Sequence, residues 1–137
     1  MHVKWDDRLT LGVDFMDQEH KDIIEKLEDV LQTLDFNAPS ESDIKKFMAF
    51  EEAVTNHFAH EELMMHQYGY PKLEVHAKAH EKIVRKIVKY KEMFLTTSID
   101  QTMLERIESD VAYIFKLHLL EEDRELEVFV HKLSQKD

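Results

Sequence analysis

The feature that most constrains the fold is a pair of short motifs in which two metal-binding side chains stand four residues apart. His57 and Glu61 form the first pair, and His76 and His80 form the second. Residues with this spacing lie on the same face of an α-helix, about one turn from each other. The sequence Gly-Tyr-Pro at 69–71 lies between the pairs and predicts a turn that folds the two helices back on each other. The four donors are therefore expected to meet inside a helical bundle.

The length and charge of the chain restrict what it can be. We expect residues 1–137 to form one domain, with residues 1–16 as an N-terminal arm. The chain has 18 Lys and Arg against 29 Asp and Glu, a net charge of −11, which argues against nucleic acid and anionic membranes as partners. It has no cysteine, so any metal must be held by nitrogen and oxygen. Because the sequence has neither a signal-like segment nor a long apolar run, we expect a cytoplasmic protein without membrane insertion.

Apolar residues at helical spacing predict four helices, arranged as an all-α, up-down-up-down antiparallel four-helix bundle. The first helix is expected to begin near Asp17 as its N-cap, and the second after the N-cap Ser40. Gly69 should end the second helix, and Pro71 suits the first turn of the third. Ser98 with an acceptor three residues later predicts a capping box at the start of the fourth.

Helix direction brings a larger set of donors to one level of this bundle. The start of the first helix, the end of the second, the start of the third and the end of the fourth share one end of the molecule. Seven side chains that can bind a metal occupy these places: His20, His57, Glu61, His76, His80, His118 and Asp123. A single buried histidine is usually a hydrogen-bonded core residue, but a buried charge without a partner costs on the order of several kcal/mol. The shared level of these donors therefore predicts a metal site.

The number and type of donors indicate which metals fit. Seven donors exceed the four of a tetrahedral ion and the six of an octahedral ion, so two ions are expected. Imidazole and carboxylate ligands suit iron, and a redox-inert pair is an alternative. Ferritin-like di-iron bundles use Glu-x-x-His motifs, and here no histidine has Glu three residues before it. The ferritin-like class is therefore disfavoured.

The spacing of His118 and Asp123 does not fit a regular helix. Five residues turn about 140° around an α-helix, so the two side chains would point in different directions. We expect the helix to loosen or bulge between them.

Taken together, the motifs resemble the hemerythrin family, and most closely its single-domain bacterial members. The resemblance covers nearly the whole chain and includes Asp-x-x-His at 17–20, His-Phe-x-x-Glu-Glu at 57–62, Tyr-Pro at 70–71, His-x-x-x-His at 76–80 and His-x-x-x-x-Asp at 118–123. It implies two iron ions (Fe2+/Fe3+), bridged by an oxo or hydroxo group and by two carboxylates, Glu61 and Asp123. The implied terminal ligands are His76, His80 and His118 for one iron, and His20 and His57 for the other. Counting these ligands leaves one coordination position open at the second iron.

The resemblance also implies a function. We expect reversible binding of dioxygen for storage, buffering or delivery to an oxygen-consuming enzyme, rather than enzymatic activity. Phe58, Ile114 and Phe115 are predicted to form an apolar oxygen pocket that excludes water. The alternatives are a di-iron enzyme that reduces peroxide or nitric oxide, an oxygen or iron sensor that acts through a separate partner, and an iron-storage protein.

Three positions depart from the family pattern. Glu19 precedes the first histidine where the family usually has Gln, Ile114 stands where it often has Trp, and Leu126 replaces an aromatic residue. His60 is rotated away from the inner face, so we expect it at the surface.

Overall fold

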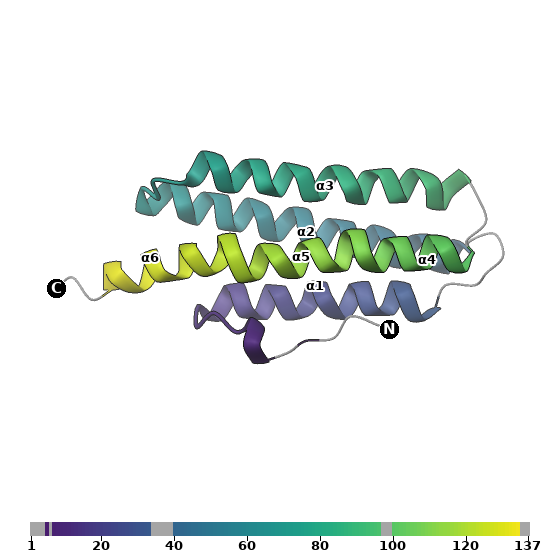
Figure 1. Cartoon of the computed structure of the whole chain (residues 1–137), viewed down its shortest axis with the longest axis horizontal. Helices are drawn as coiled ribbons and strands as arrows, with labels where there is room; N and C mark the ends of the chain where they lie inside the picture. Colours follow the sequence, from purple (N-terminus) through teal and green to yellow (C-terminus); the bar gives the residue numbers. More distant parts are fainter. Residues whose placement is uncertain (1–4, 6, 34–39, 97–99, 135–137) are drawn as a thin grey trace.

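The computed structural model describes residues 5, 7–33, 40–96 and 100–134. A short 3-10 turn, η1 (Asp7–Leu9), precedes α1 (Asp14–Thr33), α2 (Glu41–Tyr68) and α3 (Leu73–Thr96). The fourth long helix consists of five consecutive segments: α4 (Gln101–Ile107), η2 (Glu108–Ala112), α5 (Tyr113–His118), η3 (Leu119–Asp123) and α6 (Arg124–Ser134). Figure 1 shows the four long helices side by side with alternating directions, which confirms the predicted all-α bundle.

The predicted ends of α2 are confirmed. The Ser40 hydroxyl accepts a hydrogen bond from the Asp43 backbone N–H, and the Asp43 carboxylate accepts one from the Ser40 N–H, each at 3.1 Å. At the other end, Gly69 takes a left-handed conformation with φ of 64°, which a residue with a Cβ adopts at a cost. The chain can therefore reverse within a few residues and begin α3.

The predicted start of the first helix is wrong by one turn. α1 begins at Asp14, so Asp17 lies within its first turn and not at the N-cap. The Asp17 carboxylate accepts hydrogen bonds from the backbone N–H groups of Leu11, at 2.8 Å, and Gly12, at 3.0 Å. Its hydrogen-bonding capacity is used to tie the N-terminal arm to the helix.

The fourth long helix begins with a different cap from the one predicted. Ser98 lies outside the described residues, and the N-cap of α4 is Asp100, whose side chain accepts a hydrogen bond from Met103 N–H at 2.8 Å. The helix therefore starts two residues later than the Ser98 capping box implies.

The bundle core is divided into two hydrophobic clusters. The larger one lies between the later parts of α1 and α3, the earlier part of α2 and the fourth long helix. It includes Ile23, Leu27, Phe50, Phe58, Ile83, Ile87, Phe94, Ile107, Phe115 and Leu119. The smaller one, which we call the end cluster, contains Leu11, Met16, Met64, Met65, Tyr70 and Leu126. His20, Glu61 and Asp123 each fall in sequence between a residue of the larger cluster and a residue of the end cluster. The donors therefore form a polar layer across an otherwise apolar core.

The fourth helix contains two π-helical turns. η3, at Leu119–Asp123, lies between His118 and α6 and provides the bulge that the sequence predicts. η2, at Glu108–Ala112, was not predicted. Over the described residues, no helix is both long and apolar enough to cross a membrane.

Candidate metal centre

The structure brings all seven predicted donors together in the polar layer. His20 comes from α1, His57 and Glu61 from α2, His76 and His80 from α3, His118 from α5 and Asp123 from η3. Each side chain is almost inaccessible to solvent, with at most 2% of its residue surface exposed. Regular α2 and α3 segments supply the pairs four residues apart, whereas the π turn η3 brings Asp123 round to the side of His118.

The donors form two overlapping groups with the spacing of a dinuclear site. The first group contains Glu61, His76, His80, His118 and Asp123, and the second contains His20, His57, Glu61 and Asp123. In each group, one potential ligand atom from every residue lies within 4.8 Å of all the others. The two carboxylates belong to both groups. Each therefore lies within reach of the histidines of both groups.

Several donor atoms in this layer lack hydrogen bonds. Among the described residues, no hydrogen-bond partner is found for Glu61 Oε2, His76 Nε2, His118 Nε2 and both carboxylate oxygens of Asp123. They nevertheless lie close together: Asp123 Oδ1 is 2.9 Å from His76 Nε2 and 3.2 Å from His118 Nε2. Leaving buried polar atoms unsatisfied is costly. Coordination of metal ions would satisfy these atoms, so the donor set fits a metal site.

The ionisation of the metal-free donors reflects their crowding. Burial lowers the pKa of His76, but contacts with Asp123 and Glu61 outweigh it and raise the pKa to about 9. Burial also lowers the pKa of His118, but the negative charge of Asp123 outweighs it and raises the pKa to about 10. Burial and the charge of Asp123 raise the pKa of Glu61, but contacts with three histidines outweigh them and lower it to about 2. Without metal, the ionised carboxylates of Glu61 and Asp123 therefore lie beside the protonated imidazoles of His76 and His118.

Carboxylates at the edge of the layer hold three of the histidine rings. His57 Nδ1 donates to Glu19 at 2.8 Å, His80 Nδ1 donates to Glu62 at 2.9 Å, and His118 Nδ1 donates to Glu122 at 3.0 Å. A proton on Nδ1 leaves the Nε2 lone pair free to face the centre of the layer. These rings are therefore oriented as metal ligands require, and a bound metal would replace any proton on Nε2.

The three edge carboxylates were not identified from the sequence. Glu122 stands four residues after His118, so helical spacing could have indicated it, whereas Glu62 contacts His80 on another helix, 18 positions away in sequence. Glu19 contacts a histidine on another helix, 38 positions away in sequence. No local pattern indicates that contact.

The residues of the predicted oxygen pocket lie against the donors. The Phe58 ring is stacked on His80, with 3.8 Å between ring centroids and 5° between planes. The Phe115 ring is edge-on to His20, with centroids 6.2 Å apart. Ile114 is half-buried and lines a cavity of about 250 Å³ together with His118. Each of these side chains lies beside a donor, and their role in oxygen binding stays a prediction.

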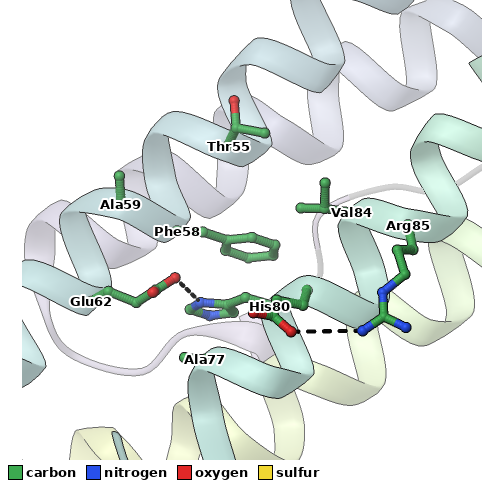
Figure 2. Close-up of a pocket in the computed structure, with 9 residues that line it drawn as sticks. Thr55, Phe58, Ala59, Glu62, Ala77, His80, Val84 and Arg85 are labelled. Atoms are coloured by element: carbon green, nitrogen blue, oxygen red, sulfur yellow. Dashed lines mark hydrogen bonds and ion pairs between the residues drawn. The ribbon is translucent and has the colours of Figure 1, made fainter. Parts of the chain in front are cut away.

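A second cavity lies between α2 and α3. Its volume is about 430 Å³, and both Phe58 and His80 line it. Figure 2 shows the Phe58 ring next to the ring of His80, and the hydrogen bond that joins His80 to Glu62. His80 therefore lies in the wall of this cavity, and the Phe58 ring covers one face of it.

The antiparallel bundle and its buried layer of five histidines and two carboxylates define a helical metal-binding protein. The model of the hemerythrin HHE cation binding domain matches residues 11–129, which is most of the chain. The chain therefore belongs to the hemerythrin family.

Several curated proteins named bacteriohemerythrin are similar to the chain. The one from Stenotrophomonas maltophilia is 34% identical over 92 residues, which is 66% of this chain and 58% of that protein. The one from Pseudomonas paraeruginosa is 33% identical over 99 residues, 68% of this chain and 60% of that protein. The one from Clostridium acetobutylicum is 27% identical over 124 residues, 88% of this chain and 95% of that protein. The match to the first two therefore spans less than two thirds of their length.

Proposed function

We propose that the protein binds two iron ions in the polar layer and uses them to bind dioxygen reversibly, for storage, buffering or delivery. The observation that carries this proposal is the division of the seven donors into two groups that share Glu61 and Asp123. The same division is implied by the resemblance to hemerythrins, with three histidines on one side and two on the other. The names of the bacteriohemerythrin relatives support it further.

The proposed roles follow from donor chemistry. His76, His80 and His118 would hold one iron, His20 and His57 the other, and Glu61 and Asp123 would bridge them. Two ferrous ions held by these residues would supply the electrons and an open coordination position for dioxygen.

The surrounding side chains support binding rather than catalysis. Phe58 and Phe115 cover the histidines with apolar rings, and the two hydrophobic clusters lie on either side of the layer. An apolar shell limits the access of water and external protons, which would otherwise promote irreversible oxidation of the iron. The nearby carboxylates are already occupied as acceptors for His57, His80 and His118. We therefore assign no residue the role of a catalytic acid or base.

The proposal is tested by reconstituting the protein with Fe2+ under anaerobic conditions. Iron is counted per chain, and absorption spectra are recorded through repeated cycles of air and argon. A carrier should hold two irons and show an absorption band that appears in air and disappears under argon. Two irons with a single irreversible change would instead indicate an enzyme that reduces peroxide or nitric oxide. Fewer than two irons would contradict the dinuclear site.

A further inference from the structure

His60, which the proposed function leaves unused, contacts Glu19 in the structure. Glu19 occupies the place where the family usually has Gln, and His60 lies one residue before Glu61 but outside the polar layer. The Glu19 carboxylate accepts a hydrogen bond from His57 Nδ1 through Oε1 and another from His60 Nδ1 through Oε2, each at 2.8 Å. Glu19 therefore joins a buried donor to a side chain at the surface.

The two donor groups differ in how their histidine rings are held. In the larger group, Glu62 and Glu122 hold two of the three rings. In the smaller group, His20 Nδ1 has no hydrogen-bond partner among the described residues. Within the described chain, Glu19 is therefore the carboxylate on which the orientation of the smaller group depends.

His60 restrains Glu19. Its side chain is 59% exposed and so adds little to the core, but it binds the carboxylate oxygen that His57 leaves free. A carboxylate with both oxygens bound is confined to one rotamer, and the Glu19 side chain is only 30% exposed. His60 and His57 together therefore fix the position of Glu19 between α1 and α2.

We propose that Glu19, held by His60, is a positioning residue for the two-histidine half of the metal site. The proposal rests on the proposed di-iron function. Glu19 would act in two separable ways. Its hydrogen bond keeps the proton on His57 Nδ1 and directs Nε2 toward the metal, and its negative charge raises the electron donation of the ring. The first effect sets metal affinity, and the second stabilises the ferric state over the ferrous state.

Two substitutions separate these effects. Glu19→Ala removes both the hydrogen bond and the charge. Glu19→Gln removes the charge but keeps an oxygen that can accept from His57, while its amide can donate to a neutral His60. His60→Ala leaves Glu19 in place but removes its restraint. Glu25→Gln, at an exposed position of the same helix, is the control for a change in net charge.

Metal affinity is measured first, by titrating the metal-free protein with Zn2+ in a calorimeter. Changes to groups that orient metal-binding histidines typically cost 10–100-fold in affinity. Glu19→Ala should therefore weaken one of the two Zn2+ sites by about 10–100-fold, and His60→Ala should weaken the same site by less. Glu19→Gln and Glu25→Gln should leave both affinities within about threefold of wild type, well below that range.

Circular dichroism identifies any variant that does not fold. If Glu19→Ala does not fold, the Zn2+ affinity of His60→Ala tests the inference instead, since the His60 side chain is exposed.

Two further readouts report directly on His57 and on charge. In Zn2+-loaded protein with 15N-labelled histidine, the His57 Nδ1–H signal should persist in Glu19→Gln and exchange rapidly with solvent in Glu19→Ala. In iron-loaded protein, the midpoint potential should rise in Glu19→Gln and stay unchanged in Glu25→Gln. Wild-type metal affinity and potential in Glu19→Ala, with two metals bound, would overturn the inference and leave the proposed function intact. A wild-type chain that binds no metal would overturn both.

Discussion

His57 and His76 are buried to a similar extent but belong to different donor groups, and this allows the two halves of the site to be tested separately. His57→Ala removes one of the two histidines of the smaller group, and His76→Ala removes one of three from the larger. We expect either change to reduce iron binding from about two ions to about one per chain, because a half-site short of a ligand holds iron weakly. Metal analysis after anaerobic loading and gel filtration measures this.

The control for these variants is His66→Ala, which changes an exposed histidine of α2 outside both donor groups. It should retain wild-type iron content. If His57→Ala and His76→Ala also retained it, the assignment of ligands would be wrong.

Ile114 offers a test of the apolar surroundings. It lines the cavity of about 250 Å³ beside His118, and a larger ring at this position would fill part of that space. Ile114→Trp should slow the autoxidation of the iron-loaded protein severalfold, because it restricts the entry of water and small anions to the site. The rate of loss of the oxygenated spectrum in air measures this effect.

Tyr113→Trp is a suitable comparison for that variant, because Tyr113 is the preceding residue and its side chain is 63% exposed. It should autoxidise at the wild-type rate. Equal rates in both variants would remove Ile114 from the oxygen pocket.

Among the structural elements, η3 has the most direct effect on the site. An ordinary α-helix would place His118 and Asp123 about 140° apart, and one additional residue in the π turn brings them to the same side. Deleting the exposed residue Leu120 should convert the π turn to an α turn and leave the two donors four residues apart, on one face. The buried face of α6 should keep its register. We therefore expect this deletion variant to fold and to retain at least one metal ion, as measured by circular dichroism and metal analysis.

Deleting Lys78 instead provides the contrast. Lys78 is also exposed but lies inside the regular helix α3, where no π turn can absorb its loss, so its deletion rotates the two parts of that helix by about 100° relative to each other. This variant should lose both metal binding and cooperative unfolding. A more damaging effect of the Leu120 deletion would contradict the role assigned to η3.

The elements also indicate how far the sequence could predict the structure. Helical periodicity and the direction of the helices were sufficient to place the seven donors at one level, because each donor lies on the same stripe as core residues. The bulge at η3 was predictable because His118 and Asp123 must face one site. By contrast, η2 contains none of the predicted donors, and nothing in its sequence distinguishes it from a regular turn.

Contacts that depend on side-chain rotamers across helices were not predictable. His60 was placed at the surface, and it is indeed exposed, but its hydrogen bond to Glu19 joins residues 41 positions apart. Asp17 was assigned as an N-cap because its residue type fits that role, and its carboxylate instead binds the arm. In both cases, the position along the helix was clear and the partner was not.

For the whole molecule, the donor layer makes stability depend on pH and on metal. The pKa values of His76 and His118 are raised above the ordinary histidine value of about 6.5. Their contribution to the free energy of unfolding is therefore fully present below about pH 6.5 and is lost as the pH rises through about 9 and about 10. The pKa of Glu61 is lowered, so its contribution is present above its ordinary value and is lost as pH falls through about 2. Between these limits the metal-free layer is held by internal ion pairs.

We therefore expect the melting temperature of the metal-free protein to fall by several degrees between about pH 8 and pH 10.5. In a domain of this size, a loss of about 1 kcal/mol in the free energy of unfolding lowers the melting temperature by roughly 3–6 °C. The metal-loaded protein should show no comparable fall, because metal-bound histidines have already lost the competing proton. Differential scanning calorimetry of both forms across this range measures the difference. Parallel curves for the two forms would contradict the assignment of His76 and His118 as ligands.

The division of the core by the donor layer has a further consequence for how metal enters and leaves. The larger cluster has 21 buried residues and includes all four long helices, whereas the end cluster has six buried residues and lies at one end of the bundle. Local opening is easiest where few apolar contacts must be broken. Separation of α6 and the N-terminal arm at that end would expose the donors while the rest of the bundle stays folded. We therefore expect the packing of the end cluster to limit the rate at which the protein exchanges metal with its surroundings.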